Sequence, residues 1–161
     1  MTRDKLLLDV GGTFIKCSDG RTIPIDSDGT REEIASSLRA ALGEADSAAI
    51  AIPGPFNYND GTFLMKHKFV DAYGERFANL VGRPSGNFKF IHDVNCMLLG
   101  EVVSGAGKGY KRAALIALGT GLGFSMYVDG KVLTNETGSP LVSIWKLPYR
   151  DGILEDYVSK R

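Results

Sequence analysis

The sequence predicts an α/β domain with a hairpin-rich sheet. Short apolar runs of strand length end at glycine or Asp-Gly turns, as in "LLLDVGGTFIK" from Leu6 to Lys16. A longer stretch, "TREEIASSLRAAL", has its leucine and isoleucine residues at helical spacing. The 161 residues, of which 43% are hydrophobic and 24% charged, suffice for a globular domain with a hydrophobic core.

Three short strands joined by tight turns are expected at the N-terminus. They cover Leu6–Val10, Phe14–Cys17 and residues 21–25. Gly11-Gly12 allows a sharp turn between the first two, and Asp19-Gly20 is a strong signal for a turn between the second and third.

A helix and a buried strand follow. Thr30 and Glu33 have the spacing of a capping box, so the helix is expected to begin after Thr30 and to stop at Gly43. The run "SAAIAIP" then predicts a short buried strand that ends at Pro53.

The remaining elements alternate in the same way. They are a turn-rich loop at 54–69 with a short strand in it, a helix at 73–82, a strand from 88 that stops at His92-Asp93, a helix at 94–105, two strands within 113–128 broken at 119–121, a hairpin at Asp129-Gly130, and an amphipathic helix within 151–160.

Four polar or glycine-rich segments lie at the ends of predicted strands. Ligands of such sheets gather at the carboxyl ends of strands, so these segments are expected to meet at one edge. The segments are Asp9, Pro53-Gly54, His92-Asp93 and Gly119-Thr120-Gly121.

The chemistry of these strand ends suits phosphoryl transfer. Backbone N–H groups and threonine hydroxyls of the two glycine turns can donate to phosphate oxygens, although neither turn is a Walker loop. Asp93 can deprotonate an attacking hydroxyl, and it can equally be an ordinary helix cap. Asp9 can hold a hydrated metal ion or be a solvated residue of a plain hairpin.

Charge and composition argue against several classes of partner. Nineteen basic residues balance nineteen acidic ones, so neither a nucleic acid nor a membrane surface is expected as a partner. No apolar run approaches the roughly 20 residues of a membrane span, and no secretory signal is recognised. Cys17 and Cys96 each lie in an apolar stretch and are expected to be small buried residues, which fits a cytoplasmic protein.

Five motifs together resemble the ROK family of bacterial sugar kinases and sugar-responsive repressors. They are "LLLDVGGTFIK", "AIPGP", "HDVNCMLLGE", "GAGKG" and "LIALGTGLGFSMYVDGKVL". The resemblance implies an actin-like (ribonuclease H-like) ATPase fold, with the N-terminal lobe at 1–112 and the start of the C-terminal lobe at 113–161. It implies a kinase that transfers a phosphoryl group from ATP to a hexose such as glucose or an N-acetylhexosamine, with Mg²⁺.

The resemblance also implies roles for single residues. Asp93 is the expected catalytic base, and Asp9 is expected to help hold Mg²⁺ through water. The expected sugar contacts are Gly54, His92, Asp93 and Glu136, and the expected phosphate contacts are Asp9, Gly11, Gly12, Thr13, Gly119, Thr120 and Gly121.

The chain departs from the family pattern in four places. His92 stands where the family usually has a sugar-contacting Asn, and Ser139 stands where it often has a zinc-binding His. The family's cysteine cluster is replaced by residues 140–151, so no zinc is expected. The sequence also stops where the rest of the second lobe would follow. Exposed strand edges are therefore expected to pair with another copy in a homo-oligomer, most simply a dimer.

The alternative to a kinase is a non-catalytic module of the same fold that binds a sugar or a phosphate. The family's repressors carry an N-terminal helix-turn-helix, whereas this sequence begins at the first strand, so DNA binding is not expected.

Overall fold

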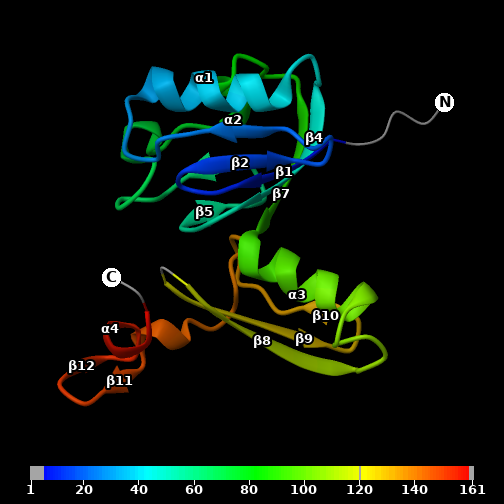
Figure 1. Cartoon of the computed structure of the whole chain (residues 1–161), viewed down its shortest axis with the longest axis vertical. Helices are drawn as coiled ribbons and strands as arrows, with labels where there is room; N and C mark the ends of the chain where they lie inside the picture. The colour runs from blue at the N-terminus through cyan, green and yellow to red at the C-terminus, as the bar shows by residue number, and fades with distance from the viewer. Residues whose placement is uncertain (1–5, 120, 160–161) are drawn as a thin grey trace. The chain divides into compact units, whose positions relative to one another are not determined.

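The computed structural model describes residues 6–119 and 121–159. The chain divides into two compact units between His92 and Asp93, and the segment Thr137–Ser139 belongs to the first unit. Each unit is described by itself (Figure 1). The first contains β1 (Leu6–Val10), β2 (Phe14–Cys17), β3 (Thr22–Pro24), α1 (Arg31–Leu42), β4 (Ser47–Ile52), β5 (Phe56–Asn57), β6 (Thr62–Phe63), the 3₁₀ turn η1 (Val70–Ala72), α2 (Phe77–Leu80) and β7 (Asn87–His92).

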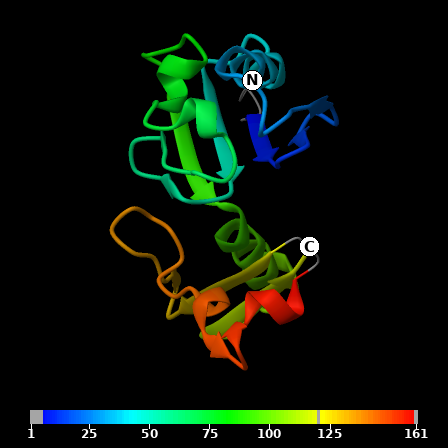
Figure 2. The same ribbon diagram turned by 90° about the vertical axis from the view of Figure 1, so that its left-hand side faces the viewer.

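The first unit is built on a mixed five-stranded sheet in the order β3-β2-β1-β4-β7. The first three strands form antiparallel hairpins, whereas β1, β4 and β7 run parallel. Figure 2 shows β4 and β7 side by side, ending at the same edge. In the register, Asp9 faces Ala51, and Ile52 faces His92. The predicted meeting of strand ends is therefore confirmed for β1, β4 and β7.

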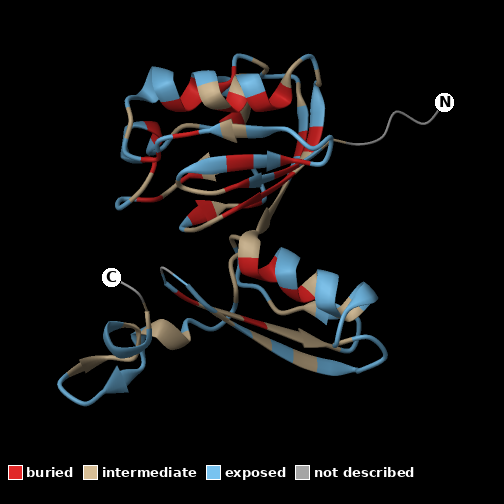
Figure 3. Ribbon diagram, viewed as in Figure 1, coloured by how far each residue is buried: buried red, intermediate tan, exposed pale blue. Residues whose placement is uncertain are grey.

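One face of this sheet carries the core. Leu8, Ile15 and Ile50 point from the strands toward α1, whose Ile34 and Leu38 are fully buried. Further along the same face, the rings of Phe56, Phe63, Phe77, Phe88 and Phe90 pack with centroids 5.1–5.3 Å apart. Figure 3 shows the buried residues gathered on this helix and these strands. Over the β1–β2 hairpin, the opposite face carries Leu7, Asp9, Phe14 and Lys16, which are all exposed.

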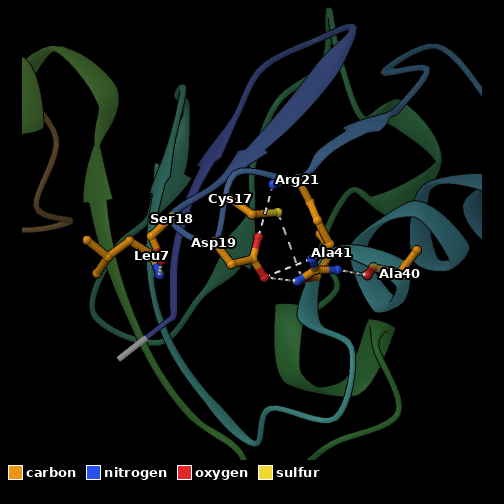
Figure 4. Close-up of polar contacts among 7 residues, drawn as sticks. All are labelled: Leu7, Cys17, Ser18, Asp19, Arg21, Ala40 and Ala41. Carbon is orange, nitrogen blue, oxygen red and sulfur yellow. Dashed lines mark hydrogen bonds and ion pairs between the residues drawn. The ribbon is translucent and has the colours of Figure 1, made fainter. Parts of the chain in front are cut away.

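The predicted start and stop of α1 are both confirmed. The Thr30 side chain accepts a hydrogen bond from the Glu33 backbone, the Glu33 carboxylate accepts from Thr30, and Gly43 ends the helix with a φ of 55°. At the same end, the Arg21 guanidinium donates to the carbonyl oxygens of Ala40 and Ala41 and pairs with Asp19 (Figure 4). The last carbonyls of a helix lack partners within it, so Arg21 supplies donors that α1 cannot.

The second unit is a sheet with one long helix. It contains α3 (Asp93–Ser104), β8 (Arg112–Leu118), β9 (Leu122–Val128), β10 (Lys131–Val132), the 3₁₀ turn η2 (Ile144–Lys146), β11 (Pro148–Tyr149), β12 (Gly152–Ile153) and α4 (Glu155–Val158). The sheet order is β10-β9-β8. Gly123 brings β9 close to α3, because a side-chain carbon there would lie 2.4 Å from Cγ1 of Val94.

Two predicted helices are shorter than expected. In the segment 73–82 only Phe77–Leu80 is helical, because Gly74 has a left-handed φ of 79° and the next residues pair with β6. In the tail, Ile153 belongs to the hairpin β11–β12, and the helix begins at Glu155. There Asp156 accepts a hydrogen bond from the Ile153 backbone, which favours the hairpin over a longer helix.

Two further expectations differ from the structure or stay open. Cys17 is buried as predicted, but Cys96 lies on the exposed side of α3. The predicted lobe boundary between residues 112 and 113 stays a prediction. The compact units divide earlier, and α3 groups with β8 and β9.

Candidate functional site

The first glycine turn joins β1 to β2 at the edge where three parallel strands end. The Gly11 backbone N–H donates to the Phe14 carbonyl oxygen at 2.9 Å and so closes the turn. Among the described residues, the backbone N–H groups of Gly12 and Thr13 have no hydrogen-bond acceptor. The turn therefore offers two backbone donors and the exposed Thr13 hydroxyl to a ligand, which is a suitable set for a phosphate.

Asp9 lies on the exposed face of the sheet, two residues before the turn. Its carboxylate is 3.8 Å from the Lys16 ammonium across the β1–β2 ladder, and the Asp9 side chain is 55% exposed. An exposed pair at this distance is weak and leaves the carboxylate open to water. A magnesium ion in a phosphate site keeps several waters and needs only one or two protein carboxylates, so Asp9 fits the water-mediated role.

The carboxyl ends of β4 and β7 bring two predicted sugar contacts together. A side-chain carbon on Gly54 would lie 3.4 Å from the His92 ring and 3.2 Å from the Tyr58 hydroxyl oxygen. The Tyr58 and His92 rings are 5.6 Å apart, and the Tyr58 hydroxyl donates to the Ile52 carbonyl oxygen. A larger residue than glycine at position 54 would fill the space between these rings.

The sequence does not predict a role for Tyr58, because no local pattern shows which residues a tyrosine in a turn-rich loop will contact. Its backbone N–H donates to the Thr137 carbonyl oxygen at 2.8 Å, and Gly138 packs against its Cβ. Tyr58 thus connects β4, His92 and the segment Thr137–Ser139, which directly follows the predicted sugar contact Glu136 in the chain.

In the second unit, Asp93 is the first residue of α3. Its Oδ1 accepts a hydrogen bond from the Val94 backbone N–H at 2.7 Å, so its carboxylate lies at the positive end of the helix. The same first turn of the helix is held to the sheet by the Ser125 hydroxyl, which donates to Oδ1 of Asn95 at 2.7 Å. Both Asn95 and Ser125 are buried. This contact fixes the start of α3 on β9, and no sequence pattern predicts it.

The second glycine turn joins β8 to β9. The Gly119 backbone N–H donates to the Gly121 carbonyl oxygen, and the predicted contact Thr120 lies outside the described residues. The Glu155 carboxylate accepts from the Leu122 backbone N–H at 2.9 Å and lies close to Gly121. The donor at the end of this turn is therefore already used by a carboxylate of the chain itself.

The predicted site residues therefore fall into two sets. Asp9, Gly11, Gly12, Thr13, Gly54 and His92 gather at one sheet edge of the first unit, and Asp93, Glu136, Gly119 and Gly121 belong to the second unit. Within residues 6–119 and 121–159, no group of three or more His, Cys, Asp or Glu side chains could hold a metal ion. The predicted absence of zinc stays a prediction, as do the individual roles. No helix in the same ranges is long and apolar enough to cross a membrane.

Comparison with known proteins gives one family and several solved structures. The chain matches the ROK family over residues 9–140. It is 29% identical over 96 residues to the glucokinase of Thermotoga maritima, an alignment that covers 59% of this chain and 30% of that protein.

Among solved structures, a ROK family glucokinase from Streptomyces griseus in complex with glucose and AMPPNP has a TM-score of 0.74 at 24% identity. A ROK family transcriptional regulator, a homologue of the E. coli MLC protein, has a TM-score of 0.75 at 19% identity. Each similarity covers 96% of this chain, which spans 57% of the first structure and 46% of the second. The predicted actin-like fold is confirmed, and the chain spans about half the length of these proteins.

Proposed function

Because the chain belongs to the ROK family, we propose that it is a sugar kinase that transfers a phosphoryl group from ATP to a hydroxyl group of a hexose. The observation that carries the proposal is the position of Asp93. It is the first residue of α3, directly after the strand that ends at His92, and the Asn95–Ser125 contact holds the start of its helix. A carboxylate held in this way can act as a general base.

In the proposed reaction, the sugar hydroxyl oxygen forms a bond to the terminal phosphorus atom as the bond to the bridging oxygen of ADP breaks. Asp93 takes the proton of the hydroxyl group. Gly54, His92 and Glu136 contact the sugar, and the two glycine turns donate hydrogen bonds to the phosphate chain. Phosphoryl transfer depends mainly on positioning and on charge neutralisation, which these groups supply.

A magnesium ion, with Asp9 as its protein carboxylate through water, would supply further charge neutralisation when bound. The Asp9 side chain remains more than half exposed, so it is accessible to a hydrated ion. ATP is the proposed donor, since the Streptomyces griseus glucokinase was solved with AMPPNP.

The experiment is a comparison of the parent chain with Asp93→Asn in ATP turnover. Purified proteins are given ATP and Mg²⁺ with a panel of hexoses and N-acetylhexosamines. The variant keeps the shape and hydrogen bonding of the side chain but removes the base, so we expect a loss of about 10²–10⁴ in sugar-dependent turnover. Equal rates in parent and variant would contradict the role of Asp93.

The alternative is a non-catalytic module of the same fold that binds a sugar or a phosphate. The similarity to a transcriptional regulator favours it, because the fold occurs there too. The turnover assay together with calorimetric titration of a hexose separates the two, since the module would bind a hexose without any sugar-dependent turnover of ATP.

A further inference from the structure

A basic side chain lies against the first glycine turn. Lys68 belongs to the loop between β6 and η1, far from the turn in sequence. A side-chain carbon on Gly12 would lie 3.8 Å from Nζ of Lys68 and 3.2 Å from Oγ of Ser27. The ammonium group therefore lies beside Gly12, in the turn whose Gly12 and Thr13 N–H groups have no acceptor among the described residues.

Backbone hydrogen bonds hold this loop beside the turn. The Ser27 backbone N–H donates to the Gly12 carbonyl oxygen at 3.0 Å, and the Phe69 backbone N–H donates to the Ser27 carbonyl oxygen at 2.6 Å. Ile25 donates in the same way to the Thr13 carbonyl oxygen. The residue that follows Lys68 is thus connected to the turn through a single intervening residue.

The residue next to Lys68 is firmly anchored. Phe69 is fully buried, and its ring packs against Phe63 at a centroid distance of 5.8 Å. Its backbone has a left-handed φ of 51°, which is unfavourable for a bulky residue and persists only where the surroundings enforce it. The path of the chain at Lys68 is therefore set by packing and by hydrogen bonds.

Lys68 forms no ion pair within the described part of the chain. Lys16 lies near Asp9 and Lys66 lies over the Tyr73 ring, whereas no carboxylate among the described residues is within ion-pair distance of Lys68. Together with the N–H groups of Gly12 and Thr13 and the Thr13 hydroxyl, its ammonium adds a charged donor at the same turn. Ammonium and backbone N–H donors in this combination suit a phosphate group.

We propose that Lys68 binds the terminal phosphate group of the phosphate donor at the Gly11–Gly12–Thr13 turn. The identity of the anion as a donor phosphate rests on the proposed kinase function, but the binding itself needs no turnover. In the reaction, Lys68 would neutralise charge on the oxygens of the phosphoryl group as it is transferred. The same donors serve the end of a nucleoside triphosphate or of an inorganic polyphosphate.

The test is calorimetric titration of the 161-residue chain with tripolyphosphate and, separately, with ATP and Mg²⁺, without any sugar. Lys68→Met is compared with Lys66→Met, which removes the same charge two residues away, and with Lys68→Arg. We expect Lys68→Met to weaken tripolyphosphate binding about tenfold to a hundredfold, the loss of a charged hydrogen bond. Lys66→Met should change it by less than about twofold at 0.15 M salt. Lys68→Arg should keep most of the affinity.

Three results would overturn the assignment: equal effects of the two methionine variants, no effect of Lys68→Met, or no tripolyphosphate binding by the parent. Circular dichroism of each variant checks that the fold is retained. The outcome is separate from that of the kinase proposal. A parent that binds tripolyphosphate through Lys68 but phosphorylates no hexose would refute the kinase and leave this assignment standing. A Lys68→Met variant that binds tripolyphosphate and phosphorylates hexose like the parent would refute the Lys68 assignment and leave the kinase proposal standing.

Discussion

At the scale of single residues, the position of Asp93 depends on a buried polar pair in the first turn of α3. Asn95 and Ser125 are each 1% exposed, and the hydroxyl of one donates to the amide oxygen of the other. A buried polar group without its hydrogen-bond partner lowers the free energy of unfolding, so loss of either side chain should destabilise the second unit. The pair thus determines where α3 begins relative to β9.

Ser125→Ala is therefore expected to destabilise the second unit by about 1–3 kcal/mol. Urea unfolding followed by the fluorescence of Trp145, the chain's single tryptophan, reports on this unit. Ser104→Ala is the control, because the Ser104 hydroxyl donates to the Gly100 carbonyl oxygen at the exposed end of the same helix. It should cost less than about 0.5 kcal/mol. Equal effects of the two substitutions would show that the Asn95–Ser125 contact is not what holds α3.

At the scale of elements, α1 shows how local chemistry sets the ends of a helix. The bonds that Glu33 accepts from the Thr30 hydroxyl and the Thr30 backbone N–H hold the pKa of its carboxyl below the ordinary range. A carboxyl whose pKa is lowered by folding stabilises the protein above its ordinary pKa of about 4.3. This contribution is lost as the pH falls through the folded-state value.

Glu33→Gln keeps a side chain that can still accept from Thr30 but removes the charge. The variant is expected to be less stable than the parent at neutral pH, and the difference should shrink as the pH falls below the ordinary glutamate pKa of about 4.3. Thermal unfolding followed by far-ultraviolet circular dichroism at several pH values measures it. A difference that stays constant over this range would contradict the role of the charged capping box.

Elements with strong local signals were predictable from the sequence, and those decided by distant contacts were not. The capping box, the Asp19-Gly20 turn and the meeting of β1, β4 and β7 follow from spacing and turn chemistry. The helix expected at 73–82 is cut short by pairing with β6, which no local pattern reveals. For the same reason the sequence did not indicate that the Tyr58 ring lies beside the His92 ring or that Lys68 lies beside Gly12.

At the scale of the whole molecule, the chain has the actin-like fold of the ROK family. The chain covers about half the length of the glucokinase and regulator structures it resembles. In the sheet of the second unit, β8 is an edge strand with Ile116 60% and Leu118 68% exposed. Apolar side chains on an edge strand favour pairing with a strand of another chain. Self-association of this chain stays a prediction.

The central claim is that this chain moves a phosphoryl group from ATP to a hexose with Asp93 as the base. Mass spectrometry of the sugar after incubation with ATP and Mg²⁺ tests this most directly, because it detects the product itself. The account predicts a hexose monophosphate with the parent and a yield lower by about 10²–10⁴ with Asp93→Asn at equal time and concentration. Unmodified sugar with the parent, across glucose and the N-acetylhexosamines, would contradict the account.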